Sequence, residues 1–397
     1  MLTMSKKVLS INSGSSSIKF KLYDMPEELI LAGGQVDRIG NEDAQVSYTI
    51  NDKSSKKVES ILDHRTAISE VISILLNSGV IKSKNEIAGV GHRISHGGPV
   101  YTHSVVVDDD VKKTIKDLSV LSPLHNPVNL EGIVEFEKAL PEAIQVAVFD
   151  TSFHKTMPEE AYMYALPYDY YKNDGIRRYG FHGPSHQYIS EKSRELFGAE
   201  QTHRVISCHL GNGSSLCALK DGKSVNTSMG FTPLAGLMMG SRSGDIDPEI
   251  IPFIEEKFKL DSEDVRRVLN RESGILGISG VSNDIREVED AAKNGNQRAA
   301  LALSMFVHQI QHYIGSYVTD LNGLDTLVFT AGIGEHDSMI RSMVCSKLSY
   351  LGVEIDEQKN ANNETSIETA NSKVKVAVIP TDEEIVIARD VVSVAKL

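Results

Sequence analysis

Residues 10–18 read SINSGSSSI, and residues 208–216, about half the chain length further on, read CHLGNGSSL. Each copy is an apolar run, a turn of glycine, serine or asparagine, and a second run, a pattern typical of two strands joined by a tight turn. Either copy taken alone is explained by a simple hairpin. The similarity between them at so large a separation indicates a duplicated domain.

Neither turn matches a nucleotide-binding motif that places a helix directly after the glycines. The chain has no GxxxxGK[ST] sequence, and neither turn completes GxGxxG between a strand and a helix. Successive N–H groups in a tight turn can still point toward one anion, and small side chains let that anion approach. Two facing turns would hold a polyphosphate, with Lys19 near a phosphate and Asn12 offering an oxygen to Mg²⁺.

Strand-like and helix-like segments alternate along the rest of the chain. Strands are predicted over 8–11, 18–23, 145–149, 205–209, 326–330 and 374–379, and helices near 66–78, 128–139, 186–197, 297–319 and 383–396. This alternation predicts an α/β protein with largely parallel sheets. Residues 331–335, AGIGE, follow one such strand, at a position where α/β folds bind ligands.

Composition narrows the class of protein. With 397 residues, 41% of them hydrophobic, the chain is long enough for two or three domains. The formal charge of -13 argues against a nucleic-acid or anionic-membrane partner. Cys208, Cys217 and Cys345 include no CxxC pair, and no apolar run suits a signal peptide or a membrane span, so we expect a cytoplasmic protein.

Four segments place charged or imidazole side chains beside glycine or aromatic residues: GHRISHGG (91–98), FDTSFH (149–154), RRYGFHG (177–183) and GSRSGD (240–245). Arginine beside glycine suits a bound anion, because the backbone can approach closely and the guanidinium matches carboxylate or phosphate oxygens. A histidine there can donate to an oxygen on which charge develops. The pairs His92/His96 and His182/His186 have a metal-ligand spacing, but Gly97 and Pro184 disrupt the helix that such a site requires.

Two carboxylates stand at the ends of predicted elements. Asp150 closes the strand over 145–149, where side chains point into the ligand crevice of an α/β fold and commonly serve Mg²⁺. Glu383 lies at a helix start. It either caps backbone N–H groups or binds a metal.

Taken in order, these motifs resemble those of the acetate kinase family, within the superfamily of acetate and sugar kinases, Hsp70 and actin. The matching stretches are NSGSSSIKF (12–20), GHRISHGG, FDTSFH, RRYGFHG, HLGNGSS (209–215), RSGDIDP (242–248) and GIGE (332–335), which span nearly the whole chain. The resemblance implies an α/β fold of two duplicated actin-like (RNase H-like) domains, a homodimer, and an active-site cleft between the domains. The expected domains are residues 1–150, with the C-terminal helix 384–397 packing back on them, and residues 151–383.

The resemblance also implies a reaction: reversible transfer of the γ-phosphoryl group of ATP to acetate, giving acetyl phosphate and ADP on the way to acetyl-CoA. Asp150, His182 and Arg242 would form the catalytic group, and Arg93 would bind the substrate carboxylate. Asn12 and Glu383 would bind Mg²⁺, which Mn²⁺ can replace. The implied nucleotide-binding residues are Lys19, His209, Leu210, Gly211, Asn212, Gly213, Asp284, Ile285, Arg286, Gly332, Ile333, Gly334, Glu335 and His336.

An acetate-like acceptor is already ionised at neutral pH, because its pKa lies near about 4–5, and it therefore needs no general base. Asp150 is then either a positioning group for Mg²⁺ or the acceptor, or the acid/base residue of the family description. The larger obstacle is repulsion between two anions. Arg93 and Arg242 would offset it, while His182 and Mg²⁺ would stabilise the transferring phosphoryl group.

Departures from the family pattern leave the acyl acceptor open. Ser95 stands where an apolar residue is usual, in a pocket that would also use Leu124, Phe181 and Pro233, so a propionate or butyrate kinase is the nearest alternative. Other departures flank the catalytic group: Pro184 for Thr, Ala235 for Glu and His336 for Asn. A sugar kinase is disfavoured because two arginines suit an anionic acceptor. An actin- or Hsp70-like nucleotide switch is disfavoured because it needs no second anion site.

Overall fold

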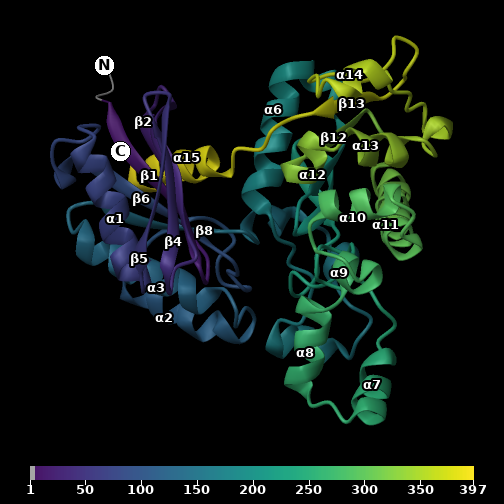
Figure 1. Cartoon of the computed structure of the whole chain (residues 1–397), viewed down its shortest axis with the longest axis horizontal. Coiled ribbons are helices and arrows are strands. Elements are labelled where there is room, and N and C mark those ends of the chain that lie inside the picture. The colour runs from purple at the N-terminus through teal and green to yellow at the C-terminus, as the bar shows by residue number, and fades with distance from the viewer. Residues whose placement is uncertain (1–4) are drawn as a thin grey trace. The chain divides into compact units, whose positions relative to one another are not determined.

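The computed structural model describes residues 5–397 and divides into two compact units (Figure 1). Unit 1 contains the chain up to Phe153 together with Asp382–Leu397, and unit 2 is His154–Thr381. Residues 1–4 lie outside the described residues. They begin the predicted N-terminal domain and the segment that was compared with a signal peptide. Each unit is built on its own sheet.

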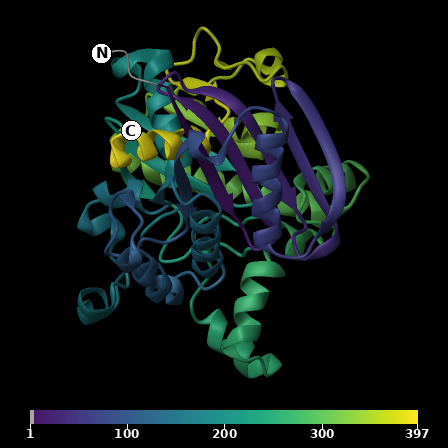
Figure 2. The same cartoon turned by 90° about the vertical axis from the view of Figure 1, so that its left-hand side faces the viewer.

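Unit 1 has an eight-stranded sheet in the order β5-β4-β3-β2-β1-β6-β8-β7. Its strands are β1 Lys6–Ser13, β2 Ser17–Met25, β3 Leu29–Asp37, β4 Asn41–Ile50, β5 Lys53–Ile61, β6 Ile87–Ile94, β7 Val105–Val106 and β8 Ile144–Phe149. The first five form an antiparallel meander, visible as long neighbouring arrows in Figure 2, and β6 and β8 then add in parallel. The expectation of largely parallel sheets was therefore wrong for this unit.

Helices pack on both faces of the unit 1 sheet: α1 His64–Asn77, α2 Asp109–Asp117, α3 Asn126–Ala139 and α15 Glu383–Ala395. One apolar core joins α1 and α3 to the sheet and includes Val90 of β6. On the opposite face, a Cβ atom at Gly91 would lie 2.4 Å from Ile387 of α15, and Gly89 is similarly close to Val391. These glycines let α15 lie directly on β6, and alternation along the strand places Arg93 on the same face.

Unit 2 has a five-stranded sheet in the order β11-β10-β9-β12-β13. Its strands are β9 Arg204–Leu210, β10 Ser214–Lys220, β11 Lys223–Thr227, β12 Thr326–Thr330 and β13 Lys375–Val378. The order and directions repeat those of β3-β2-β1-β6-β8: two antiparallel pairs followed by two parallel pairs. The repeated sequence falls on the matching hairpins, β1–β2 and β9–β10, so the α/β fold with a duplicated strand–turn–strand element is confirmed.

The helices of unit 2 are α4 Glu159–Tyr162, α5 Tyr168–Asp174, α6 Gly183–Gln201, α7 Ile250–Phe258, α8 Ser262–Arg271, α9 Gly274–Ser279, α10 Ile285–Lys293, α11 Gln297–Leu321, α12 Ala331–His336, α13 Ser338–Cys345 and α14 Glu357–Ala361. The core of the unit joins α11 to the sheet through buried residues such as Phe306 and Ile310. All three cysteines are buried and unpaired. Within residues 5–397, no helix is both long and apolar enough to span a bilayer.

Candidate active site

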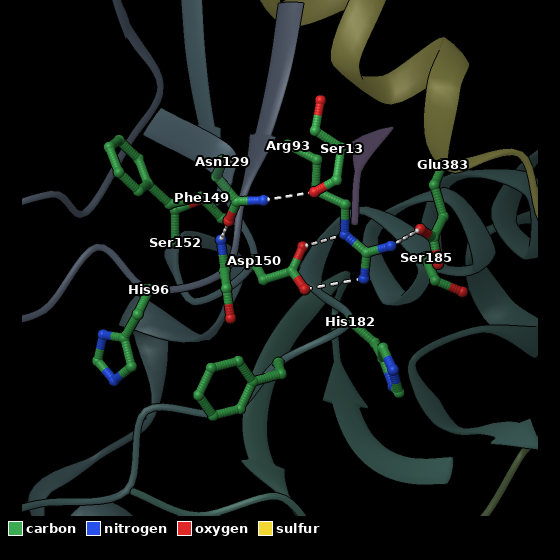
Figure 3. A network of polar contacts seen from close by, with 12 residues as sticks. Ser13, Arg93, His96, Asn129, Phe149, Asp150, Ser152, His182, Ser185 and Glu383 are labelled. Atoms are coloured by element: carbon green, nitrogen blue, oxygen red, sulfur yellow. Dashed lines mark hydrogen bonds and ion pairs between the residues drawn. The ribbon is translucent and has the colours of Figure 1, made fainter. Parts of the chain in front are cut away.

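The first cluster of predicted site residues lies in unit 1, at the end of β6. Arg93 donates from Nε to Oδ1 of Asp150 at 2.7 Å and from Nη2 to Oδ2 at 2.8 Å, while its Nη1 lies 2.7 Å from Oε2 of Glu383 (Figure 3). Asp150 follows β8, the parallel neighbour of β6, so the two strands end side by side. The structure thus brings together three residues whose sequence positions span 290 residues of the chain.

Glu383 does not cap the helix that it begins. The Asp382 side chain does so, because its Oδ1 accepts from the backbone N–H of Ile385 at 3.2 Å. The capping alternative for Glu383 was therefore wrong. Its carboxylate is directed to Arg93 instead, and that is the outcome of α15 packing closely on β6.

At this cluster, one guanidinium, that of Arg93, faces two carboxylates, those of Asp150 and Glu383. Burial alone would lower the pKa of Arg93, but the carboxylates of Asp150 and Glu383 outweigh burial and raise it. Burial raises the pKa of Glu383, the guanidinium of Arg93 lowers it, and Asp150 and Glu384 raise it further. An arginine has five N–H donors, of which three are engaged here, so two remain for an incoming anion.

A divalent cation fits this excess of negative charge. Only one oxygen of Glu383 has a partner in the described part of the chain, which leaves Oε1 available as a hard oxygen ligand. Asn12 of β1 pairs directly across the sheet with Lys19 of β2 and offers an amide oxygen. No group of three or more metal-binding His, Cys, Asp or Glu side chains occurs among residues 5–397. Two protein oxygens, completed by phosphates and water, are the usual ligands of Mg²⁺ beside a nucleotide.

The second cluster lies in unit 2, around the turn between β9 and β10. A Cβ atom on Gly213 would lie 3.5 Å from Nε2 of His182 and 3.7 Å from Nη1 of Arg242, so both side chains border the same space above this glycine. His182 occupies the position before α6 with a φ of 56°, in the left-handed region. Non-glycine residues adopt this conformation rarely, although histidine does so more readily than most.

Arg242 is a partly buried cation with weak partners. Its Nη1 donates to the carbonyl of Pro233 at 3.2 Å and contacts Sδ of Met239 at 3.6 Å, and no carboxylate in the described residues pairs with it. Burial lowers its pKa. Because a buried charge is stable only when it is paired, this guanidinium is suited to receive an anionic ligand.

A cavity of about 690 Å³ adjoins this turn in unit 2. Its lining includes most of the predicted nucleotide-binding residues: Gly211, Asn212, Asp284, Ile285, Arg286, Gly332, Ile333 and His336. The volume suits a nucleotide-sized ligand. Residues 331–336 form α12, and Gly332, Ile333 and His336 of this helix line the cavity.

Predicted residues in and around the cavity are also held by contacts within unit 2. Glu335 accepts from the backbone N–H groups of Ala331 and Thr381, and Gly334 receives a hydrogen bond from the buried Arg341. Leu210 is buried in the apolar core, and His209 stacks on His182 at a ring distance of 4.1 Å. Asp284 caps α10 and pairs with Arg286.

Several cavity residues were missed from the sequence: Asn283, Glu289, Lys293, Asp337, Ser338 and Met339. Glu289 and Lys293 follow Ile285 at intervals of four, which is one face of a helix, so the spacing could have identified them. Burial and the neighbouring Asp337 raise the pKa of Glu289 to about 7.

The remaining candidates have structural partners. In the pair His92/His96, Nε2 of His92 bonds Oε1 of Gln145, and Nδ1 of His96 accepts from the N–H of Gly98. Burial lowers the pKa of His92 to about 4. In unit 1, the Ser95 hydroxyl accepts from Ser122 at 3.1 Å. In unit 2, Phe181 packs with two buried methionines.

Comparison with known proteins places this geometry in context. The sequence profile of the acetokinase family matches residues 7–389. Acetate kinase of Bacillus cytotoxicus is 50% identical over 389 residues (97% of this chain and 98% of the relative), and propionate kinase of Citrobacter rodentium is 51% identical over 393 residues (99% and 98%). The solved structure of acetate kinase from Porphyromonas gingivalis matches with a TM-score of 0.90 and 43% identity, covering 98% of this chain and 100% of that chain. The solved structure of a propionate kinase from Francisella tularensis matches with a TM-score of 0.92 and 40% identity, covering 97% of this chain and 98% of that chain.

Proposed function

The chain belongs to the acetokinase family, and from that premise we propose that it transfers the γ-phosphoryl group of ATP directly to acetate, reversibly forming acetyl phosphate and ADP. That it is a kinase acting on a carboxylate follows from full-length relatives at about half identity. The site residues, the metal and the assembly are part of the proposal.

The observation that carries the proposal is the partly buried guanidinium of Arg242, which has no carboxylate partner in the described residues and borders the same space as the Nε2 atom of His182. A switch protein that only binds ATP, or a kinase with a neutral hydroxyl acceptor, has little need for such a cation. Transfer between two anions does need it, because the phosphoryl group and the carboxylate repel one another.

In the proposed reaction, a carboxylate oxygen of acetate forms a bond to the γ-phosphorus while the bond from that phosphorus to the β–γ bridging oxygen breaks. No proton changes place, since the acceptor is already ionised. The two remaining N–H groups of Arg93 hold the acetate carboxylate. Arg242 and His182 donate to the oxygens of the transferring group, where fixed donors stabilise developing charge.

Asp150 acts as a positioning group. Both its oxygens accept from Arg93, which fixes the plane of the guanidinium and hence the direction of the two N–H groups that face the acetate. This favours positioning over the acid/base role, because a protonated Asp150 would lose one of the two bonds.

Mg²⁺ would be held by the oxygens of Asn12 and Glu383. When bound with ATP, it supplies positive charge that offsets the phosphate oxygens. Lys19, which faces the same side of the sheet as Asn12, contacts a nucleotide phosphate. Mn²⁺ substitutes for Mg²⁺ because it also prefers oxygen ligands.

We also propose that the protein is a cytoplasmic homodimer. Each chain would have two duplicated domains, residues 1–150 with the C-terminal helix 384–397, and residues 151–383. The buried, unpaired cysteines suit a reducing compartment.

The test is formation of acyl phosphate, trapped as the hydroxamate, with Mg²⁺-ATP and acetate, propionate or butyrate, compared by kcat/KM. Highest kcat/KM with acetate supports the proposal. Propionate is the second candidate because relatives named propionate kinase are equally similar and because Ser95 departs from the family pattern. Absence of product with all three acids would contradict both.

A further inference from the structure

A chain of hydrogen bonds runs from His182 into the interior of unit 2. Nδ1 of His182 lies 2.9 Å from Oγ of Ser215, and the same Oγ lies 2.8 Å from Nε2 of His186. Nδ1 of His186 then lies 3.0 Å from Oγ of Ser207. Ser215, His186 and Ser207 are completely buried. We call these three residues the relay.

Along this relay, all the hydrogen bonds must donate in the same direction. Burial lowers the pKa of His186 well below its usual value, so its ring is neutral and carries one N–H. A serine hydroxyl also has one hydrogen. Each bond therefore has one donor and one acceptor, and the direction of any bond fixes the direction of the others.

The inner end of the relay decides between the two directions. Within residues 5–397, the Ser207 hydroxyl has one hydrogen-bond partner, Nδ1 of His186. If His186 donated to Ser207, the buried Ser207 proton would have no acceptor, which is unfavourable. Ser207 therefore donates to Nδ1 of His186, His186 donates from Nε2 to Ser215, and Ser215 donates to Nδ1 of His182.

The surroundings of His182 also favour a neutral ring. His182 precedes the N-terminus of α6, a helix of 19 residues whose positive dipole end disfavours a nearby cation. The ring of His209 stacks on it at 4.1 Å, and Arg242 borders the same space over Gly213. A protonated His182 would add a charge beside these groups.

We propose that Ser215, His186 and Ser207 are positioning residues that fix His182 as the neutral tautomer with its proton on Nε2. His182 then meets the phosphoryl group as a ready hydrogen-bond donor and need not be protonated first. The inference rests on the proposed function for the role of His182, but the tautomer itself is a property of the unliganded protein.

The direct test is NMR of the full-length protein with ¹⁵N-labelled histidine, with the His182 signals identified by their loss in His182→Gln. We expect Nε2 to carry the proton and Nδ1 to be an unprotonated acceptor, with the other tautomer at least about tenfold less populated. A proton on Nδ1 of neutral His182, or a mixture of the two tautomers, overturns the proposal.

Ser215→Ala removes the donor to His182, and Ser224→Ala is its matched control. Ser224 is equally buried and bonds a different histidine, with its Oγ 2.8 Å from Nδ1 of His154, outside the relay. We expect Ser215→Ala to lower kcat about tenfold with little change in the KM for ATP and to abolish the tautomer preference of His182. We expect Ser224→Ala to do neither.

Equal loss of kcat in both variants would show a general packing effect and overturn the relay. If Ser215→Ala does not fold, the tautomer measured in the unmodified protein still decides. The proposed function fails separately, when no acid yields acyl phosphate, and that result leaves the NMR measurement unaffected.

Discussion

Replacing Arg242 with methionine separates catalysis from stability. The substitution keeps most of the side-chain volume and removes a partly buried guanidinium whose partners are the carbonyl of Pro233 and the sulfur of Met239. Losing one charged donor to a transition state typically lowers kcat by about 10²–10³. Because replacing a buried charge with an apolar side chain is often neutral or stabilising, we expect the melting temperature to stay constant or rise.

Arg341→Met is the matched control. Arg341 is fully buried, and it donates to Asn360, Asn363 and the carbonyl of Gly334. Leaving these acceptors unpaired costs at least about 3 kcal/mol, at about 1–3 kcal/mol each. For a unit of this size the loss corresponds to a fall in melting temperature of about 6–12 °C.

The assay is steady-state kinetics with ATP and acetate varied separately, together with thermal unfolding of both variants. The expected pattern is a lost kcat and an unchanged melting temperature for Arg242→Met, and a clearly lower melting temperature for Arg341→Met. An Arg242→Met enzyme with normal kcat and only weakened ATP binding would refute the assignment of Arg242 to the transferring group.

Three further changes test other parts of the site. Gly91→Ala should lower stability by about 1–3 kcal/mol in thermal unfolding, and lower kcat as well, because its Cβ would meet Ile387 and displace α15; unchanged values would show that α15 does not depend on this contact. Glu383→Gln should raise the Mg²⁺ concentration for half-maximal activity about 10- to 100-fold, whereas a raised acetate KM alone would contradict metal binding. Burial and Asp337 raise the pKa of Glu289 from 4.5 to about 7, so its contribution to stability is complete below pH 4.5 and is lost as pH rises through 7. Glu289→Gln should therefore lose less stability than the original protein between pH 5 and pH 8 in chemical unfolding, and parallel losses would contradict the shifted pKa.

The sequence was informative where periodicity and turn chemistry act locally. The predicted helix near 297–319 is α11, and the predicted strands over 205–209 and 326–330 are β9 and β12. The meander over β3, β4 and β5 was missed, although Asn51 and Asp52, with φ of 49° and 62°, form the kind of two-residue turn that joins antiparallel strands. The expectation of largely parallel sheets came from the alternation of strand-like and helix-like segments along the chain, and it overlooked this turn.

The candidate site was only partly accessible to sequence reasoning. Motifs identified Arg93 and Asp150, and a predicted helix start identified Glu383. The sequence did not show that Arg93 would bind both carboxylates, because that contact depends on α15 lying against the glycines of β6. The Ser215–His186–Ser207 relay was also hidden. Its members come from α6, β9 and β10, and isolated serines carry no pattern that distinguishes a relay from ordinary buried hydroxyls.

The central claim, direct transfer of the phosphoryl group to a carboxylate, is tested most directly by the stereochemistry at the γ-phosphorus. ATP made chiral at that atom with oxygen isotopes is converted with acetate, and the configuration of the acetyl phosphate is determined. A single in-line displacement, aided by Arg93, Arg242 and His182, requires inversion. Retention would mean two displacements through a phosphorylated residue of this chain and would contradict the account.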